Sequence, residues 1–175
     1  MTKAKGTIGI LTGGGDVPGL NPAILAATIR ANRNGYNMVG LRNGWEGSMN
    51  IDRSKALEDQ QYCQVLDEGI VQKIARTGGT FLHTSRTKPS KVSKKNVPEF
   101  LQRNYREEVN DLTGEILKNL EYLGIEYLVP IGGDDTLSYG LRLHEEGIRC
   151  IGIPKTMDND VPGTDYCIGF STCVT

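Results

Sequence analysis

Three loops of the sequence gather the residue types that bind phosphate and divalent cations. Residues 12–19 are rich in glycine, residues 132–136 read Gly-Gly-Asp-Asp-Thr, and residues 154–165 carry one lysine, two threonines and three aspartates. Glycines let a ligand approach the backbone closely, and a helix N-terminus offers free N–H groups to an anion. The three loops together therefore favour phosphoryl transfer, which depends mainly on positioning and electrostatics.

The loop at residues 132–136 contains two adjacent carboxylates at an expected strand-to-helix turn. Asp134 and Asp135 carry the same charge sign as phosphate, so they suggest that Mg²⁺ lies between the protein and a phosphate group. The alternative is a tight turn with an acidic helix N-cap. Taken alone, this stretch favours neither interpretation.

The first loop offers a backbone cradle at Gly13, Gly14 and Gly15, directly ahead of an expected helix. It is not a Walker A motif, because GxxxxGK[ST] is missing. It is a poor dinucleotide fingerprint, because Pro18 occupies the place of the last small residue. Phosphate binding is favoured over a tight strand-to-helix turn without a ligand.

The third loop carries the residues that could perform the transfer. Asp158 and Asp160 flank a single residue, so in an extended loop they would point the same way. One carboxylate could act as a base while the other orients it or raises its pKa. Lys155 could neutralise a phosphoryl group, and Thr156 offers a hydroxyl hydrogen bond. The alternative is a cluster of Asx turns on the surface, but opposite two glycine-rich loops catalysis is favoured.

Arg86 follows a pair of glycines and an apolar anchor, and its guanidinium could clamp phosphate oxygens. Without the other loops it would be interpreted as a surface arginine. His83 is expected to pack or to form hydrogen bonds, and Trp45 and Tyr139 are expected to pack. The remaining cations form an expected solvated face: Lys88, Lys91, Lys94 and Lys95.

The elements that must position these loops alternate between strands and helices. Apolar runs predict strands at residues 7–11, 37–41, 125–131 and 148–153, and helices at 20–33, 66–74, 113–123 (capped by Thr113) and 136–146. Residues 42–47 are predicted as turns, 80–82 as a brief strand or extended piece, and 88–98 as a solvated excursion. This order predicts an α/β fold with a doubly wound parallel sheet in a Rossmann-like three-layer arrangement, whose ligands bind outside the carboxyl ends of the strands.

Composition narrows the class of protein. The 175 residues carry a net charge of −1, so no basic field points to nucleic acid or to an anionic membrane. No apolar run approaches the roughly 20 residues of a membrane helix, and no signal peptide is expected. The four cysteines contain no CxxC pair, which favours reduced thiols and a cytoplasmic location.

Four motifs, read together and in order, resemble the 6-phosphofructokinase family: residues 12–21, 78–86, 132–135 and 156–160. The resemblance implies a phosphofructokinase-type lobe in which Asp158 deprotonates the 1-hydroxyl of fructose 6-phosphate. It implies that Asp134 serves Mg²⁺. The remaining implied roles are catalysis for Lys155 and Thr156, sugar binding for Thr156, Asp158 and Asp160, and donor binding for Gly14, Gly15, Arg86, Gly133 and Asp135.

Two positions depart from the ATP-dependent bacterial pattern and resemble the pyrophosphate-dependent branch. Asp135 stands where that pattern has glycine, and Lys155 also stands in place of glycine. A carboxylate at 135 would fill and charge the space that the α-phosphate of ATP enters, and Lys155 would supply a cation to the smaller donor. Because some ATP-dependent relatives also resemble this chain at Lys155, Asp135 carries most of the inference. The alternatives are an ATP-dependent enzyme and an inactive phosphate-binding fragment.

Family members are considerably longer than this chain. Residues 1–175 are therefore expected to form the donor-binding amino-terminal lobe, with a second lobe outside this chain, little activity in isolation, and a homo-oligomer in the complete protein. Lipid and dinucleotide kinases share a related Gly-Gly-Asp-Gly-Thr loop but leave the other two loops unexplained. A nicotinamide dehydrogenase is disfavoured by the poor GxGxxG pattern.

Overall fold

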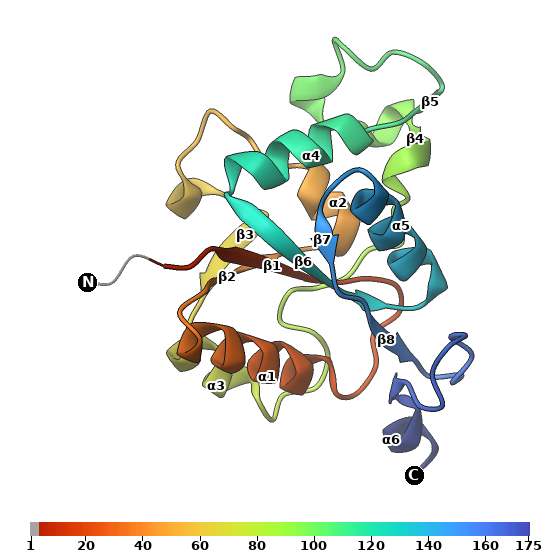
Figure 1. The fold of residues 1–175 in the computed structure, drawn as a ribbon. Coiled ribbons are helices and arrows are strands. Elements are labelled where there is room, and N and C mark those ends of the chain that lie inside the picture. The colour runs from red at the N-terminus through yellow and green to blue at the C-terminus, as the bar shows by residue number, and fades with distance from the viewer. Residues whose placement is uncertain (1–3) are drawn as a thin grey trace.

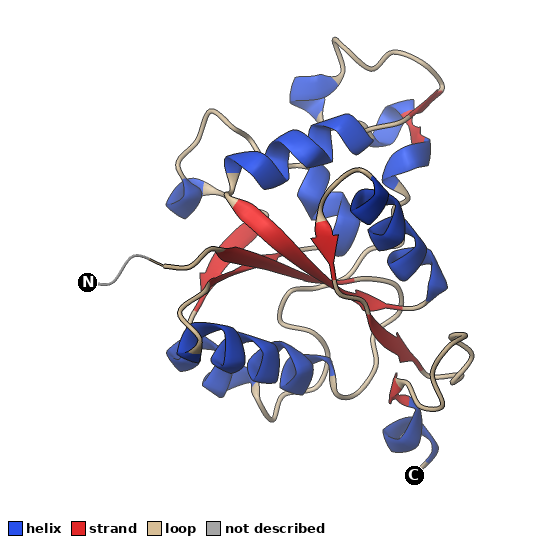
Figure 2. Cartoon of the chain, viewed as in Figure 1, coloured by secondary structure: helices blue, strands red, loops and turns tan. Residues whose placement is uncertain are grey.

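A mostly parallel sheet crosses the middle of the molecule, with helices on both of its faces (Figures 1 and 2). The computed structural model describes residues 4–175. The sheet order is β3-β2-β1-β6-β8-β9, with β7 paired to β6, and β3 is antiparallel to β2. Its strands are β1 (Thr7–Thr12), β2 (Asn37–Leu41), β3 (Cys63–Leu66), β6 (Ile125–Gly132), β7 (Arg149–Cys150), β8 (Ile153–Thr156) and β9 (Ile168–Gly169).

The helices divide between the two faces of the sheet (Figure 1). One face is covered by α1 (Leu20–Arg33) and α3 (Glu68–Ile74). The other is covered by α2 (Gly44–Met49), α4 (Thr113–Tyr122) and α5 (Asp134–Glu145). The predicted α/β three-layer fold is therefore confirmed. A short α6 (Phe170–Val174) follows β9, and single 3-10 turns occupy Leu57–Asp59, Pro89–Lys91, Lys94–Asn96 and Glu99–Leu101.

The sheet residues alternate between two hydrophobic clusters, one on each face. Ile10 packs in the cluster that includes α1, whereas Leu11 packs in the cluster that includes α4 and α5. Leu128 and Val129 divide in the same way. Because successive side chains of a strand point to opposite faces, strands buried on both sides read as continuous apolar runs.

The two central strands end side by side, and this places the site. In β1 and β6, Thr12 is the register partner of Ile131. The loops that follow these strands therefore leave the same edge of the sheet as neighbours. In the next strand of the sheet, β8, Ile153 pairs with Ile131, which brings the third loop to this edge as well.

Several helix and strand boundaries match the predictions. The bounds of α1 and β2 agree with residues 20–33 and 37–41, and Gly35 adopts φ 83°, as expected after a helix end. The α5 helix begins at Asp134 rather than Thr136, so both aspartates lie in its first turn. The cap predicted at Thr113 is wrong, because Leu112 is the N-cap and Asp111 Oδ1 instead accepts the backbone N–H and the hydroxyl of Thr113.

Other predicted elements are corrected by the structure. The strand predicted at 148–153 is two short strands, β7 and β8, because Ile151 turns outward with a 62% exposed side chain. Residues 80–82 form a turn, in which His83 N–H donates to the Thr80 carbonyl at 3.1 Å. The turns predicted at 42–47 contain the start of α2, whose N-cap Asn43 and first residue Gly44 both have positive φ.

The segment 88–98 is not a solvated excursion. Pro89, Val92 and Val97 are buried, and the two valines join the core cluster beside α4. Within the segment β4 (Val92–Ser93) pairs antiparallel with β5 (Val109–Asn110). Three of its lysines, Lys91, Lys94 and Lys95, are exposed, whereas its valines lie in the core, so the composition of the segment does not reveal its buried side.

Two further observations bear on the class of protein. All four cysteines are free thiols, and burial raises the pKa of Cys63 and of Cys150 to about 11. Among the helices of residues 4–175, none has the length and apolarity needed to cross a membrane.

Candidate active site

A cavity of about 460 Å³ opens at the edge of the sheet where β1, β6 and β8 end. All ten residues predicted for the site line it: Gly14, Gly15, Arg86, Gly133, Asp134, Asp135, Lys155, Thr156, Asp158 and Asp160. The same cavity is lined by six residues without a predicted role in the site: Val17, Trp45, Ser85, Thr87, Thr136 and Met157. The structure thus joins five segments of the sequence in one concave surface.

Gly13 and Gly132 leave room for the buried side chain of Thr136, and not for a ligand. A Cβ at Gly132 would lie 2.4 Å from the Cβ of Thr136, and a Cβ at Gly13 would lie 2.5 Å from Thr136 Oγ1. Thr136 is only 4% exposed and belongs to the first turn of α5. The expectation that these glycines admit a ligand is therefore corrected: they let α5 start close against the ends of β1 and β6.

The backbone cradle of the first loop is partly used by the protein itself. The N–H of Gly13 donates to the Ile131 carbonyl at 2.9 Å, and that of Gly14 donates to the Ser85 carbonyl at 3.0 Å. Gly14 has φ 78°, a conformation that favours glycine. Gly15 is exposed and lines the cavity. Of the three expected glycines, Gly15 is the one best placed to present its backbone to a ligand.

Lys155 is the buried cation of the site. It lies in β8, is 3% exposed, and its Nζ donates to the Gly15 carbonyl. Burial lowers its pKa and the Arg86 guanidinium lowers it further, while the Asp16 carboxylate opposes both. An anion in the cavity would relieve this cost, since it would favour the charged ammonium.

Arg86 lies against the first loop, from the segment that follows α3. A Cβ added at Gly15 would be 3.8 Å from Arg86 Nη2, so the guanidinium lies next to this glycine. Arg86 is exposed, and it lines the cavity together with the buried Lys155. The two cations therefore line the cavity from two separate chain segments, the one that follows α3 and strand β8.

Buried polar contacts hold the Arg86 segment against the sheet, and the sequence alone did not identify them. The Thr12 hydroxyl donates to the His83 carbonyl at 2.8 Å and lies 2.9 Å from the Thr80 hydroxyl. Asn21, 2% exposed, accepts the Phe81 N–H at 2.7 Å. His83 itself is exposed with φ 57°, so its backbone, not its ring, serves the site.

The third loop is bent, which corrects the extended geometry assumed for its aspartates. Asn159 has φ 53°, and its side chain donates to the Asp165 carbonyl and accepts the Cys167 N–H at 2.9 Å. Thr156 Oγ1 donates to Asp160 and accepts the Asp158 N–H, both at 3.1 Å. Asp158 and Asp160 reach the same cavity through this bend, and both are exposed.

The two aspartates of α5 have different surroundings. Asp135 pairs with Lys88 at 2.7 Å, whereas Asp134 occupies the first helical position after Gly133. Lys88 therefore has a specific contact at the cavity, although the sequence suggested a solvated face. Within residues 4–175 no three histidine, cysteine, aspartate or glutamate side chains meet as a ready-made metal cage.

Trp45 lines the cavity and also belongs to the hydrophobic core. It is 2% exposed and packs edge-on against Tyr139, with ring centroids 4.9 Å apart. The Tyr139 hydroxyl lies 3.0 Å from the buried Thr113 hydroxyl, and burial raises the pKa of Tyr139 to about 12. The predicted packing role of both aromatic residues is confirmed.

Comparison with known proteins decides the family. The phosphofructokinase family profile matches residues 7–175. The chain belongs to the phosphofructokinase family. The family inferred from the four motifs is thus confirmed, and the cavity lies among the residues that carried the inference.

Relatives within the phosphofructokinase family carry two different names. The Streptomyces coelicolor pyrophosphate–fructose 6-phosphate 1-phosphotransferase is 41% identical over 170 residues, which are 95% of this chain and 42% of that protein. The Lysinibacillus sphaericus ATP-dependent 6-phosphofructokinase is 39% identical over 167 residues, which are 95% of this chain and 44% of that protein. The chain spans less than half the length of either relative.

Solved phosphofructokinase structures share the fold. Pichia pastoris phosphofructokinase in the T-state superposes with a TM-score of 0.75 at 24% identity, over 97% of this chain and 16% of that one. The pyrophosphate-dependent phosphofructokinase of Marinobacter aquaeolei gives 0.61 at 21% identity, over 94% and 37%. These likenesses support the three-layer α/β architecture.

Proposed function

We propose that this chain forms the donor-binding lobe of a pyrophosphate-dependent phosphofructokinase, which transfers a phosphoryl group to the 1-hydroxyl of fructose 6-phosphate. The observation that carries the proposal is the meeting of Lys155, Asp135 and Asp158 in one cavity. The family membership supports phosphofructokinase chemistry, and the donor is argued from the cavity itself. The transfer belongs to the whole protein, in which a second lobe, a homo-oligomeric assembly and a cytoplasmic location are part of the proposal.

In the proposed reaction Asp158 takes the proton of the sugar 1-hydroxyl. The resulting oxygen attacks one phosphorus of pyrophosphate, the bridging P–O bond breaks, and orthophosphate leaves with the bond's electrons. Lys155 and Arg86 offset the charge on the transferring group and the leaving phosphate. Thr156 and Asp160 orient the sugar side, where the Thr156 hydroxyl already links the Asp158 backbone to Asp160.

The acidic side chains suit a divalent cation that arrives with the phosphate. Mg²⁺ usually keeps several waters and takes one or two carboxylates plus substrate phosphates. Asp134, exposed at the start of α5 and lining the cavity, fits this mode and would hold Mg²⁺. When bound, the ion would offset the negative charge of the donor. Gly133 and Gly15 present backbone to the same space.

The choice of donor rests on Asp135. Its carboxylate lines the cavity and is held toward Lys88. In the proposed binding mode it would add negative charge where a longer polyphosphate continues. Pyrophosphate lacks that continuation. The second candidate is an ATP-dependent phosphofructokinase, and the observation that favours it is the 39% identical relative of that name. Lys155 is compatible with both donors.

A binding experiment on this chain tests the proposal without requiring turnover. Trp45 is the single tryptophan and lines the cavity, so its fluorescence should change when the cavity is filled. Titration with pyrophosphate and Mg²⁺ is expected to saturate, and Asp158→Asn should bind with similar affinity while turnover in the protein's active form falls by at least about 10²-fold. Saturation by NADH, or by ATP in place of pyrophosphate, would contradict the proposed donor.

A further inference from the structure

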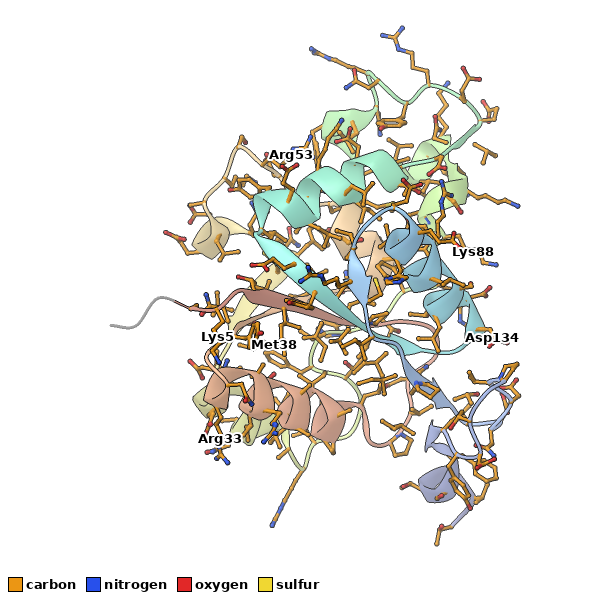
Figure 3. The ribbon with its side chains drawn as sticks, viewed as in Figure 1. Lys5, Arg33, Met38, Arg53, Lys88 and Asp134 are labelled. Atoms are coloured by element: carbon orange, nitrogen blue, oxygen red, sulfur yellow. The ribbon has the colours of Figure 1, made fainter. Side chains whose placement is uncertain are left out.

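Lys88 reaches the rim of the cavity from a segment whose other lysines face solvent. Its Nζ lies 2.7 Å from Asp135 Oδ1, and the two side chains are 56% and 78% exposed. Figure 3 shows Lys88 beside α5, on the same side of the molecule as Asp134. The ion pair therefore joins the segment that carries Arg86 to the first turn of α5 at the edge of the cavity.

The backbone of Lys88 is held on both sides, so its side chain starts from a defined place. Pro89 follows it, which restricts Lys88 to the extended conformation observed, with φ −105° and ψ 103°. Pro89 is buried, and its carbonyl accepts the Leu112 N–H at 2.8 Å. On the other side, the Ser85 carbonyl accepts the Gly14 N–H at 3.0 Å. Lys88 is thus anchored to the core and to the first loop.

Asp135 needs such a partner if it is to act on a ligand. A carboxylate that is 78% exposed is free to rotate into water, where it would neither fill nor charge the cavity. The ammonium of Lys88 gives the carboxylate one preferred direction. In addition, four aspartates line the cavity (Asp134, Asp135, Asp158 and Asp160) against the cations Arg86 and Lys155. The Lys88 ammonium offsets part of this negative charge, which lowers the repulsion that a compact polyanion would meet, while the Asp135 carboxylate still fills the space that a longer chain would need.

We propose that Lys88 is a second donor-specificity residue, which holds the Asp135 carboxylate at the cavity rim and offsets its charge there. This inference rests on the proposed function. Lys88 acts through Asp135, so it is a positioning residue and not a catalytic one. The two residues together form a clamp that accepts a short diphosphate and opposes a chain that continues into a nucleoside.

The test measures the affinities of Mg-pyrophosphate and Mg-ATP by Trp45 fluorescence in a set of matched variants of the chain. The set contains wild type, Lys88→Met, Lys88→Arg, Asp135→Gly, the double variant K88M/D135G, and the control Lys91→Met. Lys91 is an exposed lysine of the same segment. Thermal unfolding of each variant checks that the fold is retained.

Lys88→Met is expected to weaken Mg-pyrophosphate binding about threefold to fivefold, the upper part of the range for an exposed ion pair, and to lower the preference over Mg-ATP by a similar factor. Lys88→Arg should keep both the Mg-pyrophosphate affinity and the preference over Mg-ATP, and Lys91→Met should match wild type in both. In the Asp135→Gly background, Lys88→Met should leave the preference unchanged. A Lys88→Met variant that behaves like Lys91→Met, or an equal effect in both backgrounds, would overturn the inference.

A wild type that prefers Mg-ATP would contradict the proposed donor and not the clamp itself. In that case, non-additivity of Lys88→Met and Asp135→Gly for Mg-ATP would support the coupling of the two residues, and strict additivity would refute it. If neither donor binds, the proposed function and this inference both fail.

Discussion

The two sides of the cavity are held together in different ways. One side, called here the phosphoryl-donor side, consists of the first loop and the segment that carries Arg86. Its contacts join residues far apart in the sequence, such as Thr12 with His83 across 71 positions and Asn21 with Phe81 across 60. The other side, called here the sugar-acceptor side, is the loop that follows β8. The side-chain hydrogen bonds of Thr156 and Asn159 in this loop reach at most eight residues along the chain. The donor side is therefore part of the core, whereas the loop that carries Asp158 and Asp160 is ordered mainly by itself. Changes on the donor side should affect folding and donor binding, and changes in the acceptor loop should affect chemistry with little effect on folding.

The largest expected effect is on chemistry, at Asp158. Asp158→Asn should lower turnover by about 10²- to 10⁴-fold, the usual contribution of a general base, because the amide cannot accept the sugar proton. The thermal unfolding midpoint should stay near that of wild type, since Asp158 is exposed. The measurement is fructose 1,6-bisphosphate formation in the longest active form of the protein. Retention of more than half of the turnover would remove Asp158 from the proposed role.

The next effect is on the stability of the donor side, at Gly132. Gly132→Ala should lower the free energy of unfolding by about 1–3 kcal/mol, the range for forced overpacking, because its Cβ would lie 2.4 Å from that of Thr136. Gly133→Ala is the matched control, since its nearest contact is 3.7 Å away. Urea denaturation compares the two. Equal stability of both variants would show that close packing at Thr136 is unimportant.

A third expected effect is the pH dependence of donor binding through Lys155. Its pKa lies below the ordinary 10.5, mainly because of burial. At pH values below this depressed pKa the ammonium is charged and should contribute fully to binding. As pH rises through the depressed pKa, and before it reaches 10.5, pyrophosphate affinity should fall by roughly tenfold, the cost of one charge–charge interaction of about 1.4 kcal/mol.

Lys155→Arg is the control for this titration, because arginine stays charged throughout the range. In a correctly folded Lys155→Arg variant, the pyrophosphate affinity should not fall in this pH range. An identical pH profile in both proteins would assign the effect to another group or to the ligand.

The smallest expected effect on stability lies in the acceptor loop, at Asn159. Asn159→Ala removes two hydrogen bonds and places alanine at φ 53°. Because the loop is exposed and locally bonded, the free energy of unfolding should change by less than about 1 kcal/mol, while amide exchange at Cys167 should accelerate. A loss as large as that of Gly132→Ala would mean that this loop is integrated into the core after all.

The sequence predicted the parts of the fold whose signals are local. The strands predicted at residues 7–11 and 125–131 are mainly apolar runs, and α1 has both its helical periodicity and a following glycine, so these elements could be placed without knowledge of their partners. The antiparallel strand β3 was missed because its pattern is weak and its pairing with β2 provides the order. Residues 88–98 were misjudged because four lysines and two prolines dominate their composition, while the few buried apolar residues show no helix or strand periodicity.

The sequence predicted which residues meet in the cavity better than it predicted the contacts that hold them there. All ten candidate residues line one cavity, because loops at the carboxyl ends of parallel strands meet. The contacts of Thr12, Asn21 and Lys88 join chain segments that only folding brings together, so no spacing along the sequence predicts them. The crowding of Thr136 by Gly13 and Gly132 is equally invisible before the strands are aligned.

The central claim is that this cavity accepts pyrophosphate in preference to ATP because of Asp135. The most direct measurement compares Mg-pyrophosphate and Mg-ATP affinities of wild type and Asp135→Gly by Trp45 fluorescence. The account predicts that wild type binds Mg-pyrophosphate more tightly, and that Asp135→Gly gains Mg-ATP affinity by about tenfold, as expected when one repulsive charge and its steric block are removed. Preference of the wild type for Mg-ATP, or no gain of Mg-ATP affinity in Asp135→Gly, would contradict it.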